Sequence, residues 1–528
     1  MRTVSKSFIR FLVIISVVFS MVVMSSCQAP RHSSFPTLET RPSNPVDQTE
    51  TSVTNPADPE EWVTPVYLSI AVPFGKEAAE SLRLLFLARE SGLEIDSSGN
   101  YIGSNVSRDD LIRFDAPLHL DVQTVSADEG VSGDQIASWR ASGNMPDLMY
   151  CSRAAATPGL DHLLTLDELL YDHPLIVPDW VFPTTVDTLR QGEKLSGIPY
   201  LASIPLICFN KNLLEQLHVA SLPLDPTWFQ WQQWMESVQR ALTDAELSAT
   251  PDDLMLIEED SDVQKERLQR AVFVHDDLSD ILPFIPISLG GSGWAAWNGY
   301  SFLLDSQTFK LSASWLRERV RYGLSPVHLS DTQRTTAFNS TRSLRLEDRV
   351  VSWTIDSTDL AYWHQQSEIV VGESLMPHGN LQETPAASDK TAEIRMPVDV
   401  RCLVISRQSQ EPEWAARFAA FVALDPDSLL MQSRYQINEG LYPVVDDPVV
   451  WSALVDRQQF GSGISTFRER FSNAAVSGRQ LVAQWDNMMT DVFGKDALEY
   501  LAADESADLD QLFRNIQAGA GQILQEGE

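Results

Sequence analysis

From about residue 63 onward, the chain alternates between strand-like and helix-like hydrophobic patterns. Val66–Val72 is a mostly apolar run that predicts a strand, and the leucines of Lys76–Ser91 fall on or near one face of a predicted amphipathic helix. Leu118–Val125 alternates apolar and polar residues, which predicts a second strand; a helix over Asp134–Ser142 and a strand at Leu148–Tyr150 follow. This strand–helix–strand order predicts an α/β lobe with largely parallel strands.

The middle of the chain contains a segment that suits a connection between two lobes. A turn at Gly197–Tyr200 leads into an apolar run from Leu201 to Phe209, and a helix is predicted to begin at Asn212. Pro199 and Pro205 each remove a backbone donor, so the run suits an edge or crossover strand better than a central one. About two hundred residues precede the run and about three hundred follow it, enough for a domain on either side.

The N-terminal 27 residues have the pattern of an export signal. Arg2, Lys6 and Arg10 precede the uncharged apolar run Phe11–Met24, which is shorter than the roughly 20 residues of a spanning helix. The small residues before Cys27 resemble a bacterial lipobox, whose cysteine is diacylated and becomes the mature N-terminus. A plain transmembrane anchor is the alternative. Residues 28–62 are rich in Pro, Ser and Thr and predict a disordered tether.

Composition and cysteine spacing exclude several classes of function. The formal net charge of -34 argues against nucleic acid or anionic lipid as a partner. Cys151, Cys208 and Cys402 form no CxxC pair and have no ligands at metal spacing, so no metal and no cofactor is predicted. Their odd number leaves room for one disulfide at most. Residues 244–280 are acidic and predict a solvated insertion; a calcium loop is the alternative, although the EF-hand order is absent.

The loop Ile287–Tyr300 carries the most distinctive chemistry. Its glycines, Gly291 among them, permit a close approach of the backbone, and no nucleotide-binding pattern is present. Trp294 and Trp297 lie three residues apart in a loop where burial alone does not require them. Because indole faces stack on the apolar faces of pyranose rings, we expect one of the two to contact a ligand. The alternative is that at least one belongs to the core of a lobe.

The order of several short motifs resembles the extracellular solute-binding proteins of family 1, the sugar-capturing lipoproteins of ABC importers. The matching segments are GIPY at 197–200, PDLMY at 146–150, LLTLDELL at 163–170, PTW at 226–228, GG at 290–291 with DS at 305–306, and VVSWTI at 350–355. The chain departs from the family pattern where Asp356-Ser357 replaces Gly-Pro and where Asp399 and Arg401 replace glycines.

The resemblance implies a two-lobed α/β fold of the periplasmic-binding-protein type II, with the lobes joined by crossover hinge strands. We expect an N-terminal lobe of 63–203 plus approximately 358–410, and a C-terminal lobe of 204–357 plus approximately 411–528. The implied function is capture of a carbohydrate, an oligosaccharide in size, between the lobes. Hinge closure and delivery to ABC permease subunits would follow. The expected state is a monomer without catalysis, lipid-anchored through Cys27 at the extracytoplasmic face of the cell membrane.

The candidate ligand contacts lie at strand ends, at the crossovers and in the tryptophan loop, because ligands of open α/β sheets bind beyond the carboxyl ends of strands. The full set is Tyr150, Ser152, Arg153, Tyr200, Gly291, Trp294, Trp297, Trp353, Asp356, Trp363, Asp399, Arg401 and Tyr442. Arg153 facing water is equally compatible with the sequence. Asp399 and Arg401 suit bidentate binding of hydroxyls, or they pair with each other on the surface.

Two alternatives belong to other classes. A surface glycosidase would need two carboxyl groups about 5–10 Å apart, and 73 acidic residues supply such pairs by chance. No recognisable catalytic motif accompanies them. A lipoprotein of the same fold that binds a peptide or protein is the other alternative, with the 244–280 insertion as a contact surface.

Overall fold

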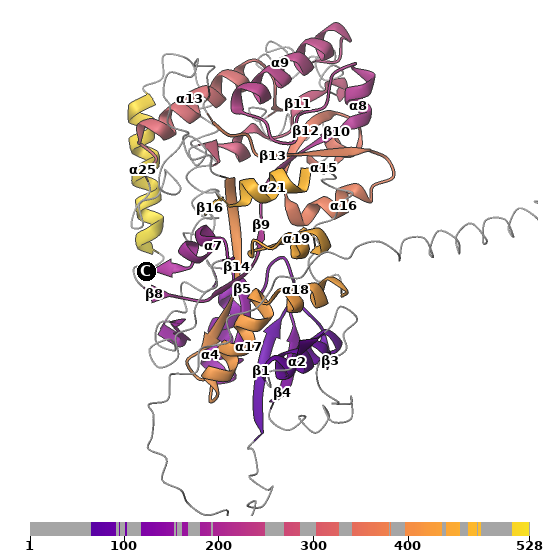
Figure 1. Ribbon diagram of the computed structural model, residues 1–528. Helices are drawn as coiled ribbons and strands as arrows, with labels where there is room; N and C mark the ends of the chain where they lie inside the picture. Colours follow the sequence, from indigo (N-terminus) through magenta and orange to yellow (C-terminus); the bar gives the residue numbers. More distant parts are fainter. Residues whose placement is uncertain are drawn as a thin grey trace, which may run out of the picture. The chain divides into compact units, whose positions relative to one another are not determined.

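The chain divides into two units, Met1–Trp62 and Val63–Glu528, and the described residues all belong to the second. The computed structural model (Figure 1) describes residues 65–90, 118–152, 161–166, 180–191, 194–248, 269–282, 303–326, 341–379, 396–435, 440–454, 463–472, 474–476 and 509–526, with a few shorter stretches. Within these residues, two β-sheets organise the fold.

The larger sheet has the order β15-β9-β14-β5-β1-β4, with β6 (Leu163–Leu164) and β16 (Ala474–Val476) also paired to β14. Its main strands are β1 (Val66–Val72), β4 (Leu118–Thr124), β5 (Leu148–Ser152), β9 (Ile198–Ser203), β14 (Met396–Ser406) and β15 (Tyr442–Pro443). β1 pairs in parallel with both β4 and β5, while β14 is antiparallel to β5 and β9. The strands and parallel pairing predicted for the first lobe are therefore confirmed.

α2 (Lys76–Glu90) and α17 (Pro412–Leu424) pack on this sheet, and α18 (Pro426–Ser433) packs against both of these helices. Phe86 of α2 contacts both Phe418 and Phe421 of α17, with ring centroids 5.4 Å apart in each pair. Buried aromatic pairs of this kind add to the hydrophobic free energy that holds helices on a sheet. A fourth helix, α4 (Gly133–Ser142), is capped by Ser132 and leads into β5.

The smaller sheet has the order β11-β12-β10-β13 and a hydrophobic core of its own. Its strands are β10 (Pro205–Asn210), β11 (Phe273–His275), β12 (Val350–Asp356) and β13 (Val371–Leu375). This core includes residues of α8 (Lys211–Gln216), α9 (Trp228–Asp244), α13 (Gln307–Arg321) and α25 (Leu509–Glu526). Thr227 and Gln230 form a complete capping box at the start of α9, so the glutamine that replaces the family's acidic residue still closes the box.

The apolar run Leu201–Phe209 crosses from one sheet to the other. β9 ends at Ser203 in the larger sheet, Ile204 makes the connection, and β10 begins at Pro205 in the smaller sheet. Pro199 lies opposite Cys402, next to an irregularity in the β9–β14 pairing, a place where proline is tolerated within a sheet. The predicted crossover is thus confirmed.

The pairing differs from the lobe boundaries expected after residue 357. β13 pairs with β10 in the smaller sheet, although 358–410 was assigned to the first lobe. α17 and α18 pack beside the larger sheet and its helix α2, although the residues after 411 were assigned to the second. The physical reason is proximity: α17 follows β14 after a short turn and covers the strands next to it with a largely apolar face.

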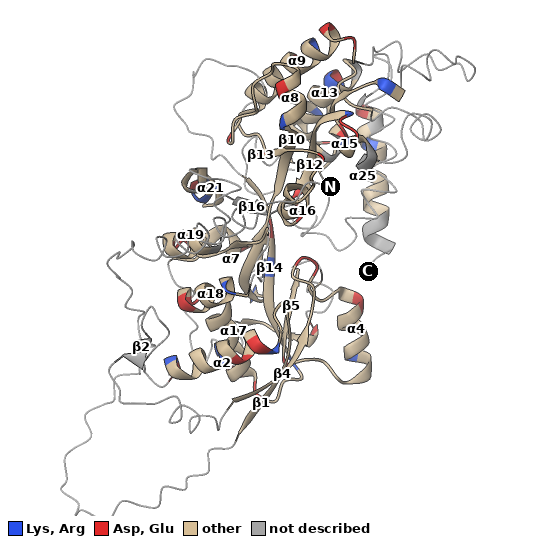
Figure 2. Cartoon of the chain, turned by 90° about the vertical axis from the view of Figure 1, so that its right-hand side faces the viewer, with Lys and Arg blue, Asp and Glu red and all other residues tan. Residues whose placement is uncertain are grey.

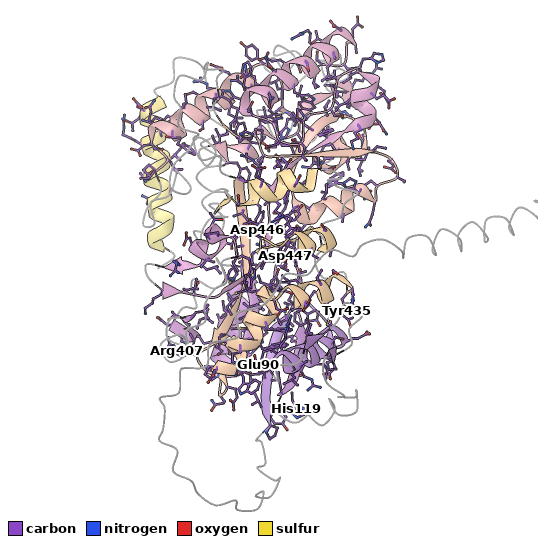
Figure 3. All side chains as sticks on the ribbon, viewed as in Figure 1. Glu90, His119, Arg407, Tyr435, Asp446 and Asp447 are labelled. Atoms are coloured by element: carbon purple, nitrogen blue, oxygen red, sulfur yellow. The ribbon has the colours of Figure 1, made fainter. Side chains whose placement is uncertain are left out.

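A network of ion pairs joins α2 to α17 and to the start of α18. α2 and α17 each carry both signs of charge (Figure 2). Arg89 of α2 contacts the carboxylate of Asp425 at 3.6 Å and that of Asp427. Glu90, the last residue of α2 (labelled in Figure 3), pairs with Arg417 of α17. Asp425 is buried and caps α18 by accepting hydrogen bonds from the backbone of Asp427 and Ser428. Burial raises the pKa of Asp425 to about 6, because desolvation outweighs the attraction of Arg89.

We expect Asp425→Asn to be more stable than the wild type at pH 7.5, by about 1–3 kcal/mol. Asparagine keeps the N-cap acceptor and removes a buried charge. The folded pKa of Asp425 lies above that of the unfolded chain, so the ionised form opposes folding above about pH 6. As the pH falls from about 6 towards 4, the folded wild type binds the proton first, and the difference should vanish. Urea unfolding of both proteins at the two ends of this range measures it; a difference independent of pH would contradict the assignment.

Candidate functional site

Three distant segments of the chain meet where the strands cross between the sheets. The Ile204 N–H donates to Ser357 Oγ at 3.1 Å, and the Ser357 N–H donates back to the Ile204 carbonyl at 2.8 Å. Ser357 Oγ also donates to the carbonyl of Gly440 at 2.6 Å. Ser203 Oγ donates to Asp356 Oδ2 at 2.9 Å. We call Ser203, Ile204, Asp356, Ser357 and Gly440 the crossover cluster.

Asp356 is held in place by the cluster itself. Its Oδ1 accepts from the Thr358 backbone at 3.0 Å and from the Thr358 hydroxyl at 2.9 Å, while Oδ2 accepts from Ser203. Burial raises the pKa of Asp356, and these hydrogen bonds together with the charge of Arg401 oppose that rise. The carboxylate is therefore fixed in orientation and has acceptor capacity left for a hydroxyl donor.

Arg401 lies beside the cluster on β14. Its Nε donates to the Asp128 carbonyl at 2.7 Å, and its Nη2 is 3.6 Å from the Asp128 carboxylate. Burial lowers the pKa of Arg401, but the surrounding acidic groups, led by Asp399, outweigh that effect and raise it, so the guanidinium stays charged. Asp399 is buried and lies opposite Ser203, two positions before Arg401 on the same strand.

The structure therefore brings together several of the residues singled out in the sequence. Asp356, Asp399 and Arg401 lie close enough for their charges to interact, and Ser152 lies opposite Arg401 across the β5–β14 pair. Sequence reasoning missed Ser203, Ile204, Ser357 and Gly440 as members of the crossover cluster, and it missed Asp128 beside Arg401. Ser203 and Asp128 carry no signal of their own: Ser203 is one serine at a strand end, and Asp128 approaches Arg401 with its backbone carbonyl and, at 3.6 Å, with its carboxylate.

The five aromatic candidates in the described residues are all buried and engaged with other core groups. Tyr150 and Tyr200 contact edge to face at 5.7 Å, and Trp353 and Trp363 have ring centroids 5.0 Å apart. Tyr442 packs in a ring cluster with Trp451 and Phe467, among others. Here the rings stabilise the core, and a role in binding stays a prediction.

The hydroxyls of Tyr150 and Tyr200 are also bonded within the protein. Tyr150 donates to the Ala127 carbonyl at 2.6 Å, and Tyr200 donates to the side chain of Gln432. Burial raises the pKa of Tyr150, so its phenol remains a neutral hydrogen-bond donor. Arg153, Gly291, Trp294, Trp297 and Cys27 lie outside the described residues.

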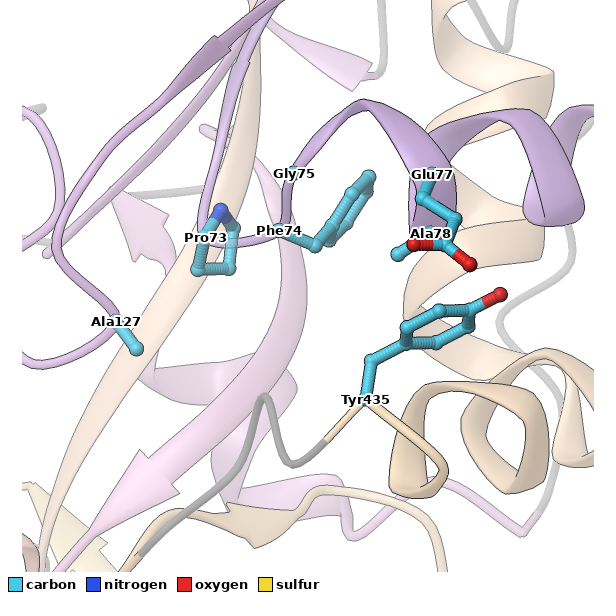
Figure 4. A pocket seen from close by; sticks show the side chains of 7 residues that line it. All are labelled: Pro73, Phe74, Gly75, Glu77, Ala78, Ala127 and Tyr435. Carbon is cyan, nitrogen blue, oxygen red and sulfur yellow. The ribbon is translucent and has the colours of Figure 1, made fainter.

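A cavity of about 370 Å³ lies at the start of α2 (Figure 4), within the range of small-molecule sites. It is lined by Pro73, Phe74, Gly75, Glu77, Ala78, Ala127 and Tyr435. In Figure 4 the Tyr435 ring faces the first turn of the helix, and its hydroxyl is bonded to Ser81 at 2.8 Å. The residue after Ala127, Asp128, is the one that Arg401 contacts. The lining itself combines apolar side chains with the carboxylate of Glu77 and the ring of Tyr435.

Two β-sheets, each covered by helices and linked to the other by crossover strands, define the type II periplasmic-binding-protein fold. This agrees with the fold expected from the sequence. No helix among the described residues is both long and apolar enough to span a membrane.

Comparison with solved structures supports this assignment. The chain is similar to an ABC substrate-binding protein from Listeria monocytogenes in complex with cycloalternan, with 12% identity, a TM-score of 0.55, and coverage of 87% of this chain and 99% of that one. It is similar to the sugar-binding protein MalE from Xanthomonas citri, with 14% identity, a TM-score of 0.57 and coverage of 88% and 98%. It is also similar to a cyclic α-maltosyl-1,6-maltose binding protein from Arthrobacter globiformis, with 12% identity, a TM-score of 0.58, and coverage of 88% of this chain and 100% of that one. Neither a scan against protein-family models nor a search of curated proteins finds a match.

Proposed function

We propose that this chain is a family 1 solute-binding lipoprotein that captures an oligosaccharide and delivers it to an ABC permease. The observation that carries the proposal is the position of Asp356, Asp399 and Arg401 together at the crossovers of this fold. Charged donors and acceptors held by the protein suit sugar hydroxyls, because charge-assisted hydrogen bonds are stronger than neutral ones. Two of the three similar structures described above are named as proteins that bind a sugar, and the third is named as a complex with cycloalternan.

The lipid anchor at Cys27, the tether of 28–62 and the extracytoplasmic location are parts of the same proposal. A lipobox cysteine receives diacylglycerol as a thioether, so the exported wild type should incorporate labelled fatty acid and partition with membranes. Cys27→Ser should incorporate none and be released. We also propose that the protein does not catalyse a reaction on its ligand. Analysis of the products after incubation with a bound sugar tests this part of the proposal.

The direct test is calorimetry and tryptophan fluorescence of the mature chain against linear and cyclic α-glucans, other oligosaccharides, amino acids and short peptides. A saturable response with one site for an oligosaccharide supports the proposal. Binding of peptides with silence across the sugars would favour the peptide-binding alternative, and turnover of a sugar would favour the glycosidase.

For a sugar that binds in this panel, Arg401→Met should weaken affinity about 10–100-fold, the loss expected for a hydrogen bond to a charged group. The matched control is Arg417→Met, which removes another partly exposed, ion-paired arginine, on α17. Affinity should stay unchanged in the control. An equal loss of affinity in both variants, or no loss in either, would show that Arg401 is not part of the binding site.

A further inference from the structure

We infer that Cys151 and Cys402 are a dithiol site that is oxidised to a disulfide joining β5 to β14. The two residues lie directly opposite each other in the antiparallel β5–β14 pair. Directly opposite residues project their side chains to the same face of a sheet, with Cα atoms about 4.5–5.5 Å apart. This spacing falls within the range of disulfides, about 4.4–6.8 Å. The Cys402 thiol also donates to the Cys151 carbonyl at 3.5 Å.

The third cysteine of the folded part is placed differently. Cys208 lies on β10 of the smaller sheet, opposite Trp353 on one neighbouring strand and Glu373 on the other. It therefore has no thiol across from it, and the geometry selects one pairing of the three that three cysteines allow. The sequence alone left this choice open.

The oxidation has a defined balance. Each thiol loses its hydrogen, the two sulfurs form one bond, and the two electrons reduce a disulfide-bearing oxidant to two thiols. Oxidised glutathione or a thiol–disulfide oxidoreductase of an oxidising compartment supplies that disulfide. Export by the predicted signal would place the chain in such a compartment.

Burial sets when the bond forms. Both thiols are fully buried in the centre of the larger sheet, out of reach of an oxidant once β14 has packed against β5. The hydrogen bond with Cys402, and then burial, raise the pKa of the Cys151 thiol, which makes Cys151 a poor nucleophile in the packed sheet. We therefore place oxidation during folding, as β14 joins β5 across 251 residues of chain.

The bond would also fix part of the candidate binding site. The next pair along the two strands is Arg401 opposite Ser152. A covalent link one residue away limits sliding and fraying of β14 against β5, so it holds Arg401 in register with the strand end that it faces. Closing a loop of this length also removes entropy from the unfolded chain.

The test uses the full chain expressed with export to an oxidising compartment, denatured with a thiol-blocking reagent before any reduction, digested and mapped by mass spectrometry. We expect the peptides of Cys151 and Cys402 to be joined, and Cys208 to be blocked as a free thiol. Cys208→Ser should leave the joined peptides unchanged, and Cys151→Ser should leave Cys402 free. Dithiothreitol should lower the midpoint of thermal unfolding of the wild type by on the order of 5 °C, but not that of Cys151→Ser.

A second arm separates the pairing from the location of the protein. The reduced, unfolded full chain is refolded in a mixture of oxidised and reduced glutathione, and the peptides are mapped in the same way. Formation of the Cys151–Cys402 bond supports the inference even if export fails. Blocked thiols at Cys151, Cys208 and Cys402 in both arms, or a bond that includes Cys208, would overturn it.

Discussion

Arg345→Met should lower the free energy of unfolding by about 3–5 kcal/mol, the loss typical of removing one partner of a buried ion pair. Arg345 Nε donates to Asp276 Oδ2 at 2.8 Å, and a second guanidinium nitrogen contacts the same oxygen. Asp276 is only 3% exposed and follows β11 in the smaller sheet. Without the arginine, its carboxylate would lie in the interior with no cation to balance it.

Among the described residues, Arg345 and His275 are the possible cations that contact Asp276, and His275 cannot replace the arginine. His275 is fully buried, and burial lowers its pKa to about 3, so its imidazole is neutral. Its Nδ1 is already bonded to Ser352 Oγ at 2.9 Å. The Arg345 guanidinium also lies 5.5 Å from the ring centre of Trp363, a cation–π contact that the substitution removes as well.

The pH dependence follows from the sign of the shift. Burial raises the pKa of Asp276 even with the arginine present, since desolvation exceeds the attraction of Arg345. In Arg345→Met the pKa should rise further, so the destabilisation is greatest above that pKa and shrinks as the pH falls and the carboxyl group takes up a proton.

Two variants control for the loss of packing. Arg345→Met combined with Asp276→Asn should recover much of the stability, because no buried charge remains. Arg319→Met changes a more deeply buried arginine that stacks on Trp315 at 4.1 Å, but its acidic partner Glu318 is exposed, so its cost should be clearly smaller. Denaturant unfolding measures all three. A loss in the double variant equal to that in Arg345→Met would mean that packing, not charge, is what the arginine supplies.

Hydrophobic patterning predicted where helices and strands lie along the chain better than it predicted which other elements they pack against. The pattern of Val66–Val72 and the helix after it were predicted nearly to the residue, because alternation and helical period depend only on neighbouring residues. The same pattern in Pro412–Leu424 predicts a helix without saying which sheet it covers. That choice depends on β14, which precedes it, and on contacts with α2 far away in the chain.

The candidate site shows the same division. Asp356, Asp399 and Arg401 are candidates because charged residues stand at positions where the family that the sequence resembles has glycine or proline. The fold brings the charges of these three residues together. The aromatic residues could not be assigned from the sequence, since a ring stacked on a sugar and a ring stacked on another ring require the same residue type. Trp353 and Trp363 pack against each other with their ring planes tilted by 55°.

Gly440→Ala should destabilise the protein by about 3 kcal/mol or more, through the crossover cluster. Gly440 has a φ of +72°, and a Cβ there would lie 2.2 Å from the Ser357 carbonyl oxygen and 2.5 Å from the Thr358 Cα. Both neighbours are backbone atoms in a segment that is bonded to Ile204, so neither can move away without breaking the link between the crossovers.

Gly143→Ala is the matched control, because Gly143 has nearly the same φ, +70°, and nothing within 4 Å of an added Cβ. It should cost about 1 kcal/mol, the strain of the left-handed conformation alone. The difference between the two variants in denaturant unfolding therefore measures how closely the 440 segment approaches Ser357. If the two alanines cost the same, the approach is not tight, and the three segments of the crossover cluster are free to separate. A larger loss in Gly440→Ala shows that the contact is rigid, which would confine any hinge motion to the backbone on either side of it.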